Sequence, residues 1–349
     1  RILSSAASDV YKRQQYTDHG SHVAGLVKMI RDQAIPDFAD AVKVKILPVR
    51  FINESGLGST SNAILALEYA AQRGAKVLNM SWGAKGTANF SQALYDTCVD
   101  LYEIHDMVLI AAAGNADFAG PNNNDSQPYF PANFNLPNLL SVASITPFYS
   151  SISGTHLRNE ISYFSNYGRN SVHVAAPGHT FESGFNQGVP SVNGLFGVGG
   201  PSFAIKYVRK SGTSMAAPLV AGVAGVMRAL NPSLTSYEVR KIIQDSALIT
   251  SDDVGLSSRV KYGRVNAYQA MLQASNYISQ NEKPAIPKNK YSSSSIESSG
   301  SSSGFAGCGM VTDHNDPGGP FGGNSILLFG LIGLILHFSR RIKFAPKSA

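Results

Sequence analysis

Short runs of apolar and β-branched residues alternate with amphipathic helical patterns along most of this 349-residue chain. The clearest helical patterns are residues 61–73 and 90–104, and Gly74 is placed to end the first of them. Because parallel strands joined by helices are covered on both faces, the alternation predicts an α/β fold with a mostly parallel central sheet flanked by helices. The expected buried strands are residues 42–49, 77–80, 108–113, 140–144 and 172–175.

The composition divides the chain into four parts. Residues 1–14 (RILSSAASDVYKRQ) continue neither pattern and resemble a translated adapter sequence, so they are interpreted as a non-native or unstructured segment. Residues 15–275 carry the α/β pattern and are predicted to form one domain. Residues 276–319 are rich in Ser, Gly, Pro and Asn, a composition typical of a linker. Residues 320–345 are first apolar and then basic.

The apolar part of the tail predicts a membrane span. Residues 320–338 are 19 residues without a formal charge, which extend about 28 Å as a helix, enough for one crossing. A buried C-terminal helix is the alternative, but the Ser-rich spacer before it and Arg340-Arg341 after it favour a transmembrane or sorting tail. The positive-inside rule then places the large domain outside the cytoplasm, in the cell envelope. Cys308 precedes this tail and is either a lipidation or sorting position or an ordinary thiol.

Charge and cysteine content exclude other classes of protein. The 29 Lys and Arg residues against 23 Asp and Glu give a net charge of +6, and part of that excess lies in the C-terminal tail. No basic stripe runs through the body of the chain, so nucleic acid is not expected as a partner. The two cysteines, Cys98 and Cys308, do not suggest a disulfide framework, and Cys98 is expected to pack in the core.

The first of three short motifs is DHGSHVAG, residues 18–25, at the expected start of a helix. A histidine held rigidly there, with an ordinary pKa of about 6.5, suits general-base chemistry at neutral pH. A solvent-facing histidine is the ordinary alternative. His19 and His22, three residues apart, are alternatively a pair of metal ligands. No HExxH pattern or cysteine cluster completes a zinc site, so no metal site is expected.

The second and third motifs place a serine and an asparagine at the ends of apolar elements. GTSMAAP, residues 212–218, puts Ser214 at the N-terminus of a long apolar helix, where unsatisfied N–H groups favour a nucleophile whose reaction generates an oxyanion. An ordinary serine N-cap is equally compatible with this position. AAAGN, residues 111–115, ends a strand at Asn115, whose amide either donates to such an oxyanion or forms a turn.

Taken together and in this order, the three motifs resemble those of the subtilisin-like serine proteases. HGSHVAG is similar to the family's HGTHVAG, and GTSMAAP matches the family's nucleophile motif without change. The resemblance continues through VLNMSWG, PYFPANF, ISYFSNYG, VHVAAPG and YGRVNAYQA, and it covers about residues 17–272. It implies a three-layer subtilisin-like fold, incomplete at the N-terminus, and a serine endopeptidase that acts on a peptide or protein substrate.

The resemblance also assigns roles to individual residues. It makes His19 the general base, Ser214 the nucleophile, and Asn115 an oxyanion donor beside the backbone N–H of Ser214. Tyr129 matches a position near the floor of the pocket for the residue before the scissile bond. Edge segments in the family pair with an extended substrate backbone, which gives affinity without sequence selectivity. The matching pairing and pocket-wall residues here are Ser81, Trp82, Gly83, Gly56, Leu57, Gly58, Ala112 and Gly114.

One feature of the family is missing from the sequence. The family's triad runs Asp, His, Ser along the chain, and only Asp9 and Asp18 precede His19. Asp9 lies in the excluded segment, and Asp18 adjoins His19 too closely to reach its far ring nitrogen. We therefore expect that the catalytic Asp and the first strand are missing and that the chain as it stands is nearly inactive. The alternatives are a non-catalytic peptide-binding pseudoprotease at the cell surface and a peptide cyclase or ligase on the same fold.

The resemblance requires no cofactor. Its members often bind calcium, and residues 117–125 (DFAGPNNND) are rich in oxygen ligands, so a structural calcium ion and an ordinary turn are both open alternatives there. The chain is expected to be a monomer whose partners are its substrate and, through the tail, a membrane.

Overall fold

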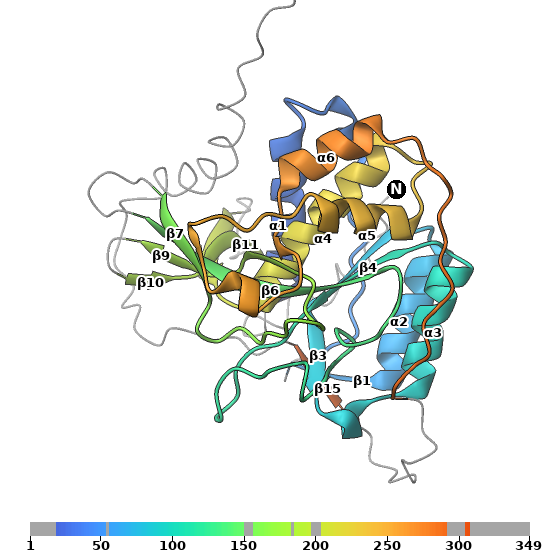
Figure 1. Ribbon diagram of the computed structural model, residues 1–349, viewed down its shortest axis with the longest axis horizontal. Helices are drawn as coiled ribbons and strands as arrows, with labels where there is room; N and C mark the ends of the chain where they lie inside the picture. The colour runs from blue at the N-terminus through green and yellow to red at the C-terminus, as the bar shows by residue number, and fades with distance from the viewer. Residues whose placement is uncertain are drawn as a thin grey trace, which may run out of the picture.

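Helices and strands alternate along the chain from His19 onward, as the sequence predicts (Figure 1). The structure is a computed structural model, and the residues it describes are 19–53, 56–149, 156–182, 185–196, 204–291 and 304–307. All statements about the structure concern these residues. The helices are α1 (His19–Ala34), α2 (Thr60–Gln72), α3 (Gln92–Glu103), α4 (Thr213–Leu230), α5 (Ser236–Asp245) and α6 (Ala267–Asn276).

The central sheet is mostly parallel, which confirms the predicted fold class. The strands β2, β4, β6 and β8 pair in that order, each parallel to the next, and β2 lies at the end of the row. Shorter strands extend β6 at its far end, where β7 is antiparallel to it. The strands of this sheet are β2 (Val77–Met80), β4 (Val108–Ala112), β6 (Leu139–Tyr149), β7 (His156–Ile161), β8 (Val174–Pro177), β9 (Thr180–Glu182), β10 (Phe185–Gln187), β13 (Asp253–Val254) and β14 (Gly263–Arg264).

The core lies on both faces of this sheet. Figure 1 shows α1, α4, α5 and α6 grouped together and α2 beside α3 in a second group. At the centre of the first group is α4, which packs against α1, α6 and the strands β4 and β6. Among the described residues, α4 is the one helix long and apolar enough to cross a membrane, and 83% of its apolar window is buried in the domain. Its apolar composition is therefore accounted for by packing in the core.

The contact between α1 and α4 depends on a glycine. A Cβ atom at Gly222 of α4 would lie 2.7 Å from the Cβ atom of Ile30 in α1, so no larger residue fits without moving one helix. Because α1 begins with His19 and α4 begins at Thr213, this contact fixes the two helix starts relative to each other. The packing of two helices thus positions the two motifs that lie 195 residues apart (214 − 19).

A second, antiparallel sheet has the order β1, β15, β3, β5. Its strands are β1 (Leu57–Ser59), β15 (Gly304–Gly307), β3 (Trp82–Lys85) and β5 (Tyr129–Phe130). The middle strand β15 comes from the segment predicted to be a linker, far along the chain from its neighbours. The remaining predicted parts, residues 1–14 and the tail from 308 onward including the apolar run 320–338, lie outside the described residues.

The structure departs from the sequence prediction at residues 42–49. A short 3-10 helix, Ala39–Lys43, begins this stretch, and the chain then continues to residue 53 without regular structure. Ile46, Leu47 and Val49 are each more than one third exposed. The prediction of a buried strand there is wrong for the described chain. An apolar run supplies side chains for a sheet, but a strand also needs a neighbouring backbone to complete its ladder.

Residues 277–291, which follow α6, lie along the surface of the domain, and we call them the strap. The carboxylate of Glu238 in α5 accepts a hydrogen bond of 2.7 Å from the backbone N–H of Gln280. Tyr102 of α3 donates its hydroxyl to the carbonyl of Pro284 at 2.7 Å. The strap therefore crosses from α5 to α3, and it appears in orange beside α3 in Figure 1.

Candidate active site

Ser214 lies in the first turn of α4 and is almost fully buried. Its hydroxyl donates to the carbonyl of Ser81 at 3.2 Å, and the Ser81 hydroxyl donates to the carbonyl of Ser214 at 2.9 Å. Ser81 directly precedes β3, so these two bonds join the start of α4 to the start of that strand. The structure thus brings together the predicted nucleophile and one predicted substrate-binding residue.

Asn115 lies at the same helix start. Its side-chain Oδ1 accepts from the backbone N–H of Thr213 and from the Thr213 hydroxyl, both at 2.9 Å. These two donors fix the orientation of the amide, because Oδ1 must face Thr213. The N–H donors on Nδ2 then lie on the other side, and Nδ2 is 3.2 Å from the position of a Cβ atom at Gly212. The amide of Asn115 therefore contacts Thr213, the residue directly before Ser214.

His19 begins α1 and is held near α4 by the contact at Gly222. Its Nε2 atom is buried and has no hydrogen-bond partner among the described residues. Burial, together with the positive charge of Lys210, lowers the pKa of His19 to about 4. The imidazole is therefore neutral at neutral pH, with a ring nitrogen available to take a proton. The structure records no hydrogen bond between His19 and Ser214, whose hydroxyl donates to Ser81.

The charge of Lys210, which lies close to Ser214 in the sequence, acts on His19. Lys210 ends β12 (Ala204–Lys210), four residues before Ser214. Among the described residues, no carboxylate contributes to the pKa of His19. The sequence analysis did not single out Lys210, because nothing in the pattern around it ties it to a histidine 191 residues earlier (210 − 19).

His22, the second histidine of the motif, anchors a hairpin. The hairpin consists of β11 (Val189–Phe196) and β12, and its carbonyls at Val189 and Val208 lie 3.0 and 3.2 Å from His22 Nε2. A carbonyl only accepts hydrogen bonds, so Nε2 carries the proton. In return, Ser191 donates its hydroxyl to the His22 carbonyl at 2.8 Å. His22 therefore fixes the hairpin to α1, and the alternative of a metal pair with His19 has no support in this geometry.

The predicted substrate-pairing segments face each other across β15. Leu57 and Gly58 belong to β1, Trp82 and Gly83 belong to β3, and Gly56 is the residue before β1. All of them lie in or beside the antiparallel sheet whose third strand begins next to Ser81 and Ser214. The structure therefore places the predicted pairing segments on the two sides of β15, and we call the strand position between β1 and β3 the channel.

The predicted pocket walls are Ser81–Gly83 and 111–114, and the ring of Tyr129 lies between them. A Cβ atom at Gly83 would be 2.3 Å from Tyr129 Cε1, and one at Gly114 would be 2.8 Å from the other edge of the ring. Gly114 also has a φ of +98°, so no other residue fits there without strain. Ala112 ends β4 and is fully buried. The ring of Tyr129 therefore fills the space that the two glycines leave open.

The oxygen-rich segment 117–125 is engaged in hydrogen bonds within the protein. Asp117 pairs with Lys85 at 2.9 Å, and Asp125 accepts from the backbone N–H of Ser171 at 2.8 Å. The buried amide of Asn124 donates to the carbonyl of Ala113 at 2.8 Å, next to the end of β4. Across the described part of the chain, no three His, Cys, Asp or Glu side chains gather as metal ligands. Calcium binding at this segment stays a prediction from the sequence.

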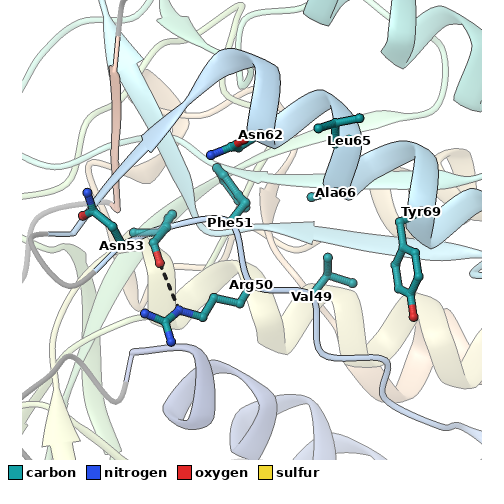
Figure 2. Close-up of a pocket in the computed structure, with 9 residues that line it drawn as sticks. Val49, Arg50, Phe51, Asn53, Asn62, Leu65, Ala66 and Tyr69 are labelled. Carbon is teal, nitrogen blue, oxygen red and sulfur yellow. Dashed lines mark hydrogen bonds between the residues drawn. The ribbon is translucent and has the colours of Figure 1, made fainter. Parts of the chain in front are cut away.

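A hollow lies beside β1, away from Ser214. Figure 2 shows it between residues 49–53 and the outer face of α2, where Leu65 and Tyr69 are exposed. Phe51 separates this hollow from the second sheet: its ring packs edge-on against Trp82, with the ring centroids 5.1 Å apart. The hollow therefore lies behind the channel and carries none of the predicted catalytic side chains.

Comparisons with known proteins agree with this geometry. The Peptidase_S8 profile, described as the Subtilase family, matches residues 4–285. The chain is 32% identical over 259 residues to Thermitase of Thermoactinomyces vulgaris, an alignment that covers 74% of this chain and 76% of that protein. In structure it is similar to a protease from Pseudoalteromonas arctica, with a TM-score of 0.53 and 28% identity, covering 73% of this chain and 70% of the other.

Two longer proteins are also similar to the chain. It is 34% identical over 213 residues to Subtilisin-like protease 2 of Plasmodium falciparum, covering 60% of this chain and 13% of that protein. It is 31% identical over 240 residues to the Cell wall-associated protease of Bacillus subtilis, covering 69% of this chain and 22% of that protein. The chain thus spans less than a quarter of the length of these two relatives.

Proposed function

The chain belongs to the subtilase family, and from that premise we propose that it is a serine endopeptidase that cleaves peptides or proteins through an acyl-enzyme on Ser214. The observation that carries the proposal is the meeting of Ser81 and Asn115 at the start of α4, where hydrogen bonds of 2.9 to 3.2 Å join Ser81 to Ser214 and Asn115 to Thr213. The three segments are far apart in the chain, and folding alone does not require a hydroxyl, an amide and a helix N-terminus to lie together.

In the proposed reaction the Ser214 hydroxyl attacks the carbonyl carbon of the substrate. Its proton passes to Nε2 of His19, and a bond forms between Ser214 Oγ and the carbon. The carbon–nitrogen bond then breaks as His19 returns the proton to the leaving amine. Water, activated by the same imidazole, releases the acid product and restores the serine. The neutral, unpartnered Nε2 of His19 supports this role.

Asn115 and the backbone N–H of Ser214 are proposed to stabilise the negative charge on the substrate oxygen. A donor contributes most when its orientation is fixed before the reaction begins. The two bonds from Thr213 to Asn115 Oδ1 supply that fixed orientation. The helix N-terminus at Ser214 adds a partial positive charge at the same point.

The proposal includes a carboxylate that orients His19 through Nδ1, carried on a strand upstream of α1. Within the described chain, the outer edge of β2 pairs with no strand, which leaves room in the sheet for such a neighbour. Loss of this Asp lowers kcat by about 3 × 10⁴ in subtilisin itself. We therefore expect very low activity from the present residues alone.

Reaction with a fluorophosphonate probe tests the proposal. The experiment uses the complete gene product and compares it with Ser214→Ala and with Ser258→Ala, an exposed serine, as the matched control. Labelling that disappears in Ser214→Ala and persists in Ser258→Ala is the expected result. Labelling that survives in Ser214→Ala would contradict the proposed nucleophile.

A non-catalytic peptide-binding protein is the second candidate, because no carboxylate among the described residues acts on His19. It predicts peptide binding without any labelling of Ser214 in the complete gene product. A cyclase or ligase would form the same acyl-enzyme and differ only in the nucleophile that resolves it, so the mass of the products distinguishes it from a hydrolase.

We place the peptidase domain outside the cytoplasm, in the cell envelope. One similar protein is described as cell wall-associated, and the sequence ends in an apolar run followed by arginines. Protease accessibility of the domain on intact cells tests this location, and protection of the domain from added protease would contradict it.

A further inference from the structure

The strand β15 occupies the channel between β1 and β3. Gly304–Gly307 is antiparallel to β1 on one side, with Ala306 opposite Leu57. It is antiparallel to β3 on the other side, with Gly307 opposite Trp82. Figure 1 shows β15 beside β3 and β1, at the edge of the domain. A segment of the chain itself therefore takes the place between the two strands that the family resemblance assigns to substrate pairing.

The direction of β15 leads toward the nucleophile. Because β15 is antiparallel to β3, its carboxyl end lies at the amino end of β3. The residue directly before β3 is Ser81, which exchanges two hydrogen bonds with Ser214. A chain that enters the channel at Gly304 and leaves it at Gly307 is thus headed toward the buried Ser214 hydroxyl.

The strap delivers the chain to the same sheet. It ends at Tyr291, whose ring is 4.9 Å from that of Phe130, with the two rings nearly perpendicular. Phe130 belongs to β5, which pairs with β3 through Ala84. Twelve residues (303 − 291) separate Tyr291 from β15, and they can span up to about 40 Å when extended. The start of this connection is therefore fixed near the channel.

Because 12 residues connect Tyr291 to β15, the strand can occupy the channel even if its affinity for the channel is low. Four residues paired on two sides would bind poorly as a free peptide, because ordering the backbone opposes the binding. Because only 12 residues join the segment to the strap, its local concentration at the channel is on the order of millimolar. At that concentration even a millimolar affinity fills the channel in about half of the molecules.

We infer that Gly304–Gly307 binds in the channel between β1 and β3 as an internal competitor of peptide substrates and so limits access to Ser214. This inference rests on the proposed function in one respect, that substrates lie between β1 and β3. The chemistry that recognises the segment is backbone pairing. The ligand class of the channel is therefore an extended peptide, and the first such peptide it meets is the chain's own.

The test breaks the pairing of β15 without touching the domain. In the full chain, Phe305→Pro together with Ala306→Pro removes one N–H that faces each neighbouring strand, because successive residues face opposite sides. Ser294→Pro, outside the paired residues, is the matched control, and deletion of 304–307 is a second variant of the same kind. All are made in a Ser214→Ala background, so that no peptide is cleaved, and equal unfolding temperatures show that the domain is intact.

The readout is the fluorescence of Trp82, the one tryptophan of the chain, which lies opposite Gly307. An acetylated, amidated peptide with the sequence of residues 301–307 (SSSGFAG) is the probe. We expect the double-proline chain and the deletion to bind it with saturation at least tenfold below the concentration that the parent and Ser294→Pro require. Equal binding to all four chains would overturn the inference.

Labelling of the same variants in the complete gene product, with serine restored at position 214, separates the inference from the proposed function. Faster fluorophosphonate labelling of the double-proline chain than of the parent supports both. Labelling at equal rates contradicts competition at Ser214. No labelling in any chain, together with the expected difference in peptide binding, contradicts the proposed catalysis and supports the occupation of the channel by β15.

Discussion

At the scale of single residues, the side-chain amide of Asn115 has two separate roles, one for its oxygen and one for its nitrogen. Oδ1 accepts both donors of Thr213, and Nδ2 is proposed to donate to the substrate oxygen. Asn115→Asp keeps an acceptor for Thr213 and replaces the donor with an oxygen. We expect it to lower kcat by about 100- to 1,000-fold, a range established in subtilisin, with an unchanged unfolding temperature. Asn170→Ala, at an exposed asparagine, is the control, and an Asn115→Asp enzyme of full activity would contradict the assignment.

The pKa of His19 sets the acid limit of the proposed reaction. Burial and then the charge of Lys210 lower this pKa to about 4, so the neutral imidazole persists well below pH 6. Lys210→Met removes the second cause and should raise the pKa, which moves the acid limb of fluorophosphonate labelling to higher pH. Lys241→Met, in α5, is the control and should leave the limb in place. An acid limb that stays in place in Lys210→Met would show that Lys210 does not act on His19.

Tyr129 is expected to limit the side chain that precedes the scissile bond. Its ring fills the space between Gly83 and Gly114, so the chain should prefer substrates with Gly, Ala or Ser at that position. Tyr129→Ala empties the space and should raise kcat/KM for substrates with Phe or Leu there by at least about tenfold. Tyr69→Ala, on the exposed face of α2, should leave the preference unchanged. A preference that is the same in wild type and Tyr129→Ala would exclude this role.

The sequence identifies the candidate catalytic residues because each lies in a short motif. His19, Asn115 and Ser214 are recognisable from their neighbours alone, and the structure bonds Asn115 to Thr213, the residue before Ser214. Lys210 and the contact of Tyr129 with two glycines depend on distances between remote segments. No local pattern encodes such distances, so these features appear only in the folded chain.

At the scale of elements, substitution by alanine should have opposite effects on the stability of the fold at two glycines of α4. Gly222→Ala places a methyl group 2.7 Å from Ile30 and should destabilise the fold by about 1–3 kcal/mol. At Gly225 the nearest atom to the new methyl group is 3.4 Å away, which is ordinary contact. Gly225→Ala should be neutral or stabilising by up to about 1 kcal/mol, because alanine favours a helix. Urea unfolding measures both, and equal effects would contradict the close approach of α1 and α4.

Elements that form from their own periodicity were predicted best. The predicted helix 61–73 is found as α2, and Gly74 has a φ of +77° directly after it. The strands at 77–80 and 108–113 are confirmed as β2 and β4, which pair in the central sheet; β4 is buried, and β2 is mostly half-buried. The hairpin of β11 and β12 was not predicted, because His22, which lies far from it in the sequence, anchors it through the carbonyls of Val189 and Val208.

At the scale of the whole molecule, buried histidines make stability depend on pH. His19 and His22 have pKa values lowered to about 4, mainly by burial, from an unfolded value near 6.5. Between these values the unfolded chain binds more protons than the folded one, so stability rises with pH. Each group should cost up to about 3 kcal/mol as the pH falls from about 6.5 to 4. Urea midpoints that are equal at pH 7.5 and 4.5 would contradict the burial of these rings.

The arrangement of the two sheets could be predicted only in part. The central sheet follows from the alternation of strands and helices, because each helix returns the chain to the next parallel strand. The second sheet joins strands from three distant parts of the chain, and β15 comes from a Gly- and Ser-rich segment without strand periodicity. The position of β15 depends on backbone pairing, which cannot be predicted from the pattern of side chains.

The contacts of the strap with Glu238, Tyr102 and Phe130 together set the length of the leash on which β15 is held. With the strap attached, the leash is the 12 residues from 292 to 303, whereas a released strap would lengthen it to the 27 residues from 277 to 303. Local concentration falls roughly as the −3/2 power of leash length, so release would dilute the segment at its channel about threefold. Contacts of the strap with α5 and α3 would thereby affect how fully a distant channel is occupied, although they do not touch it.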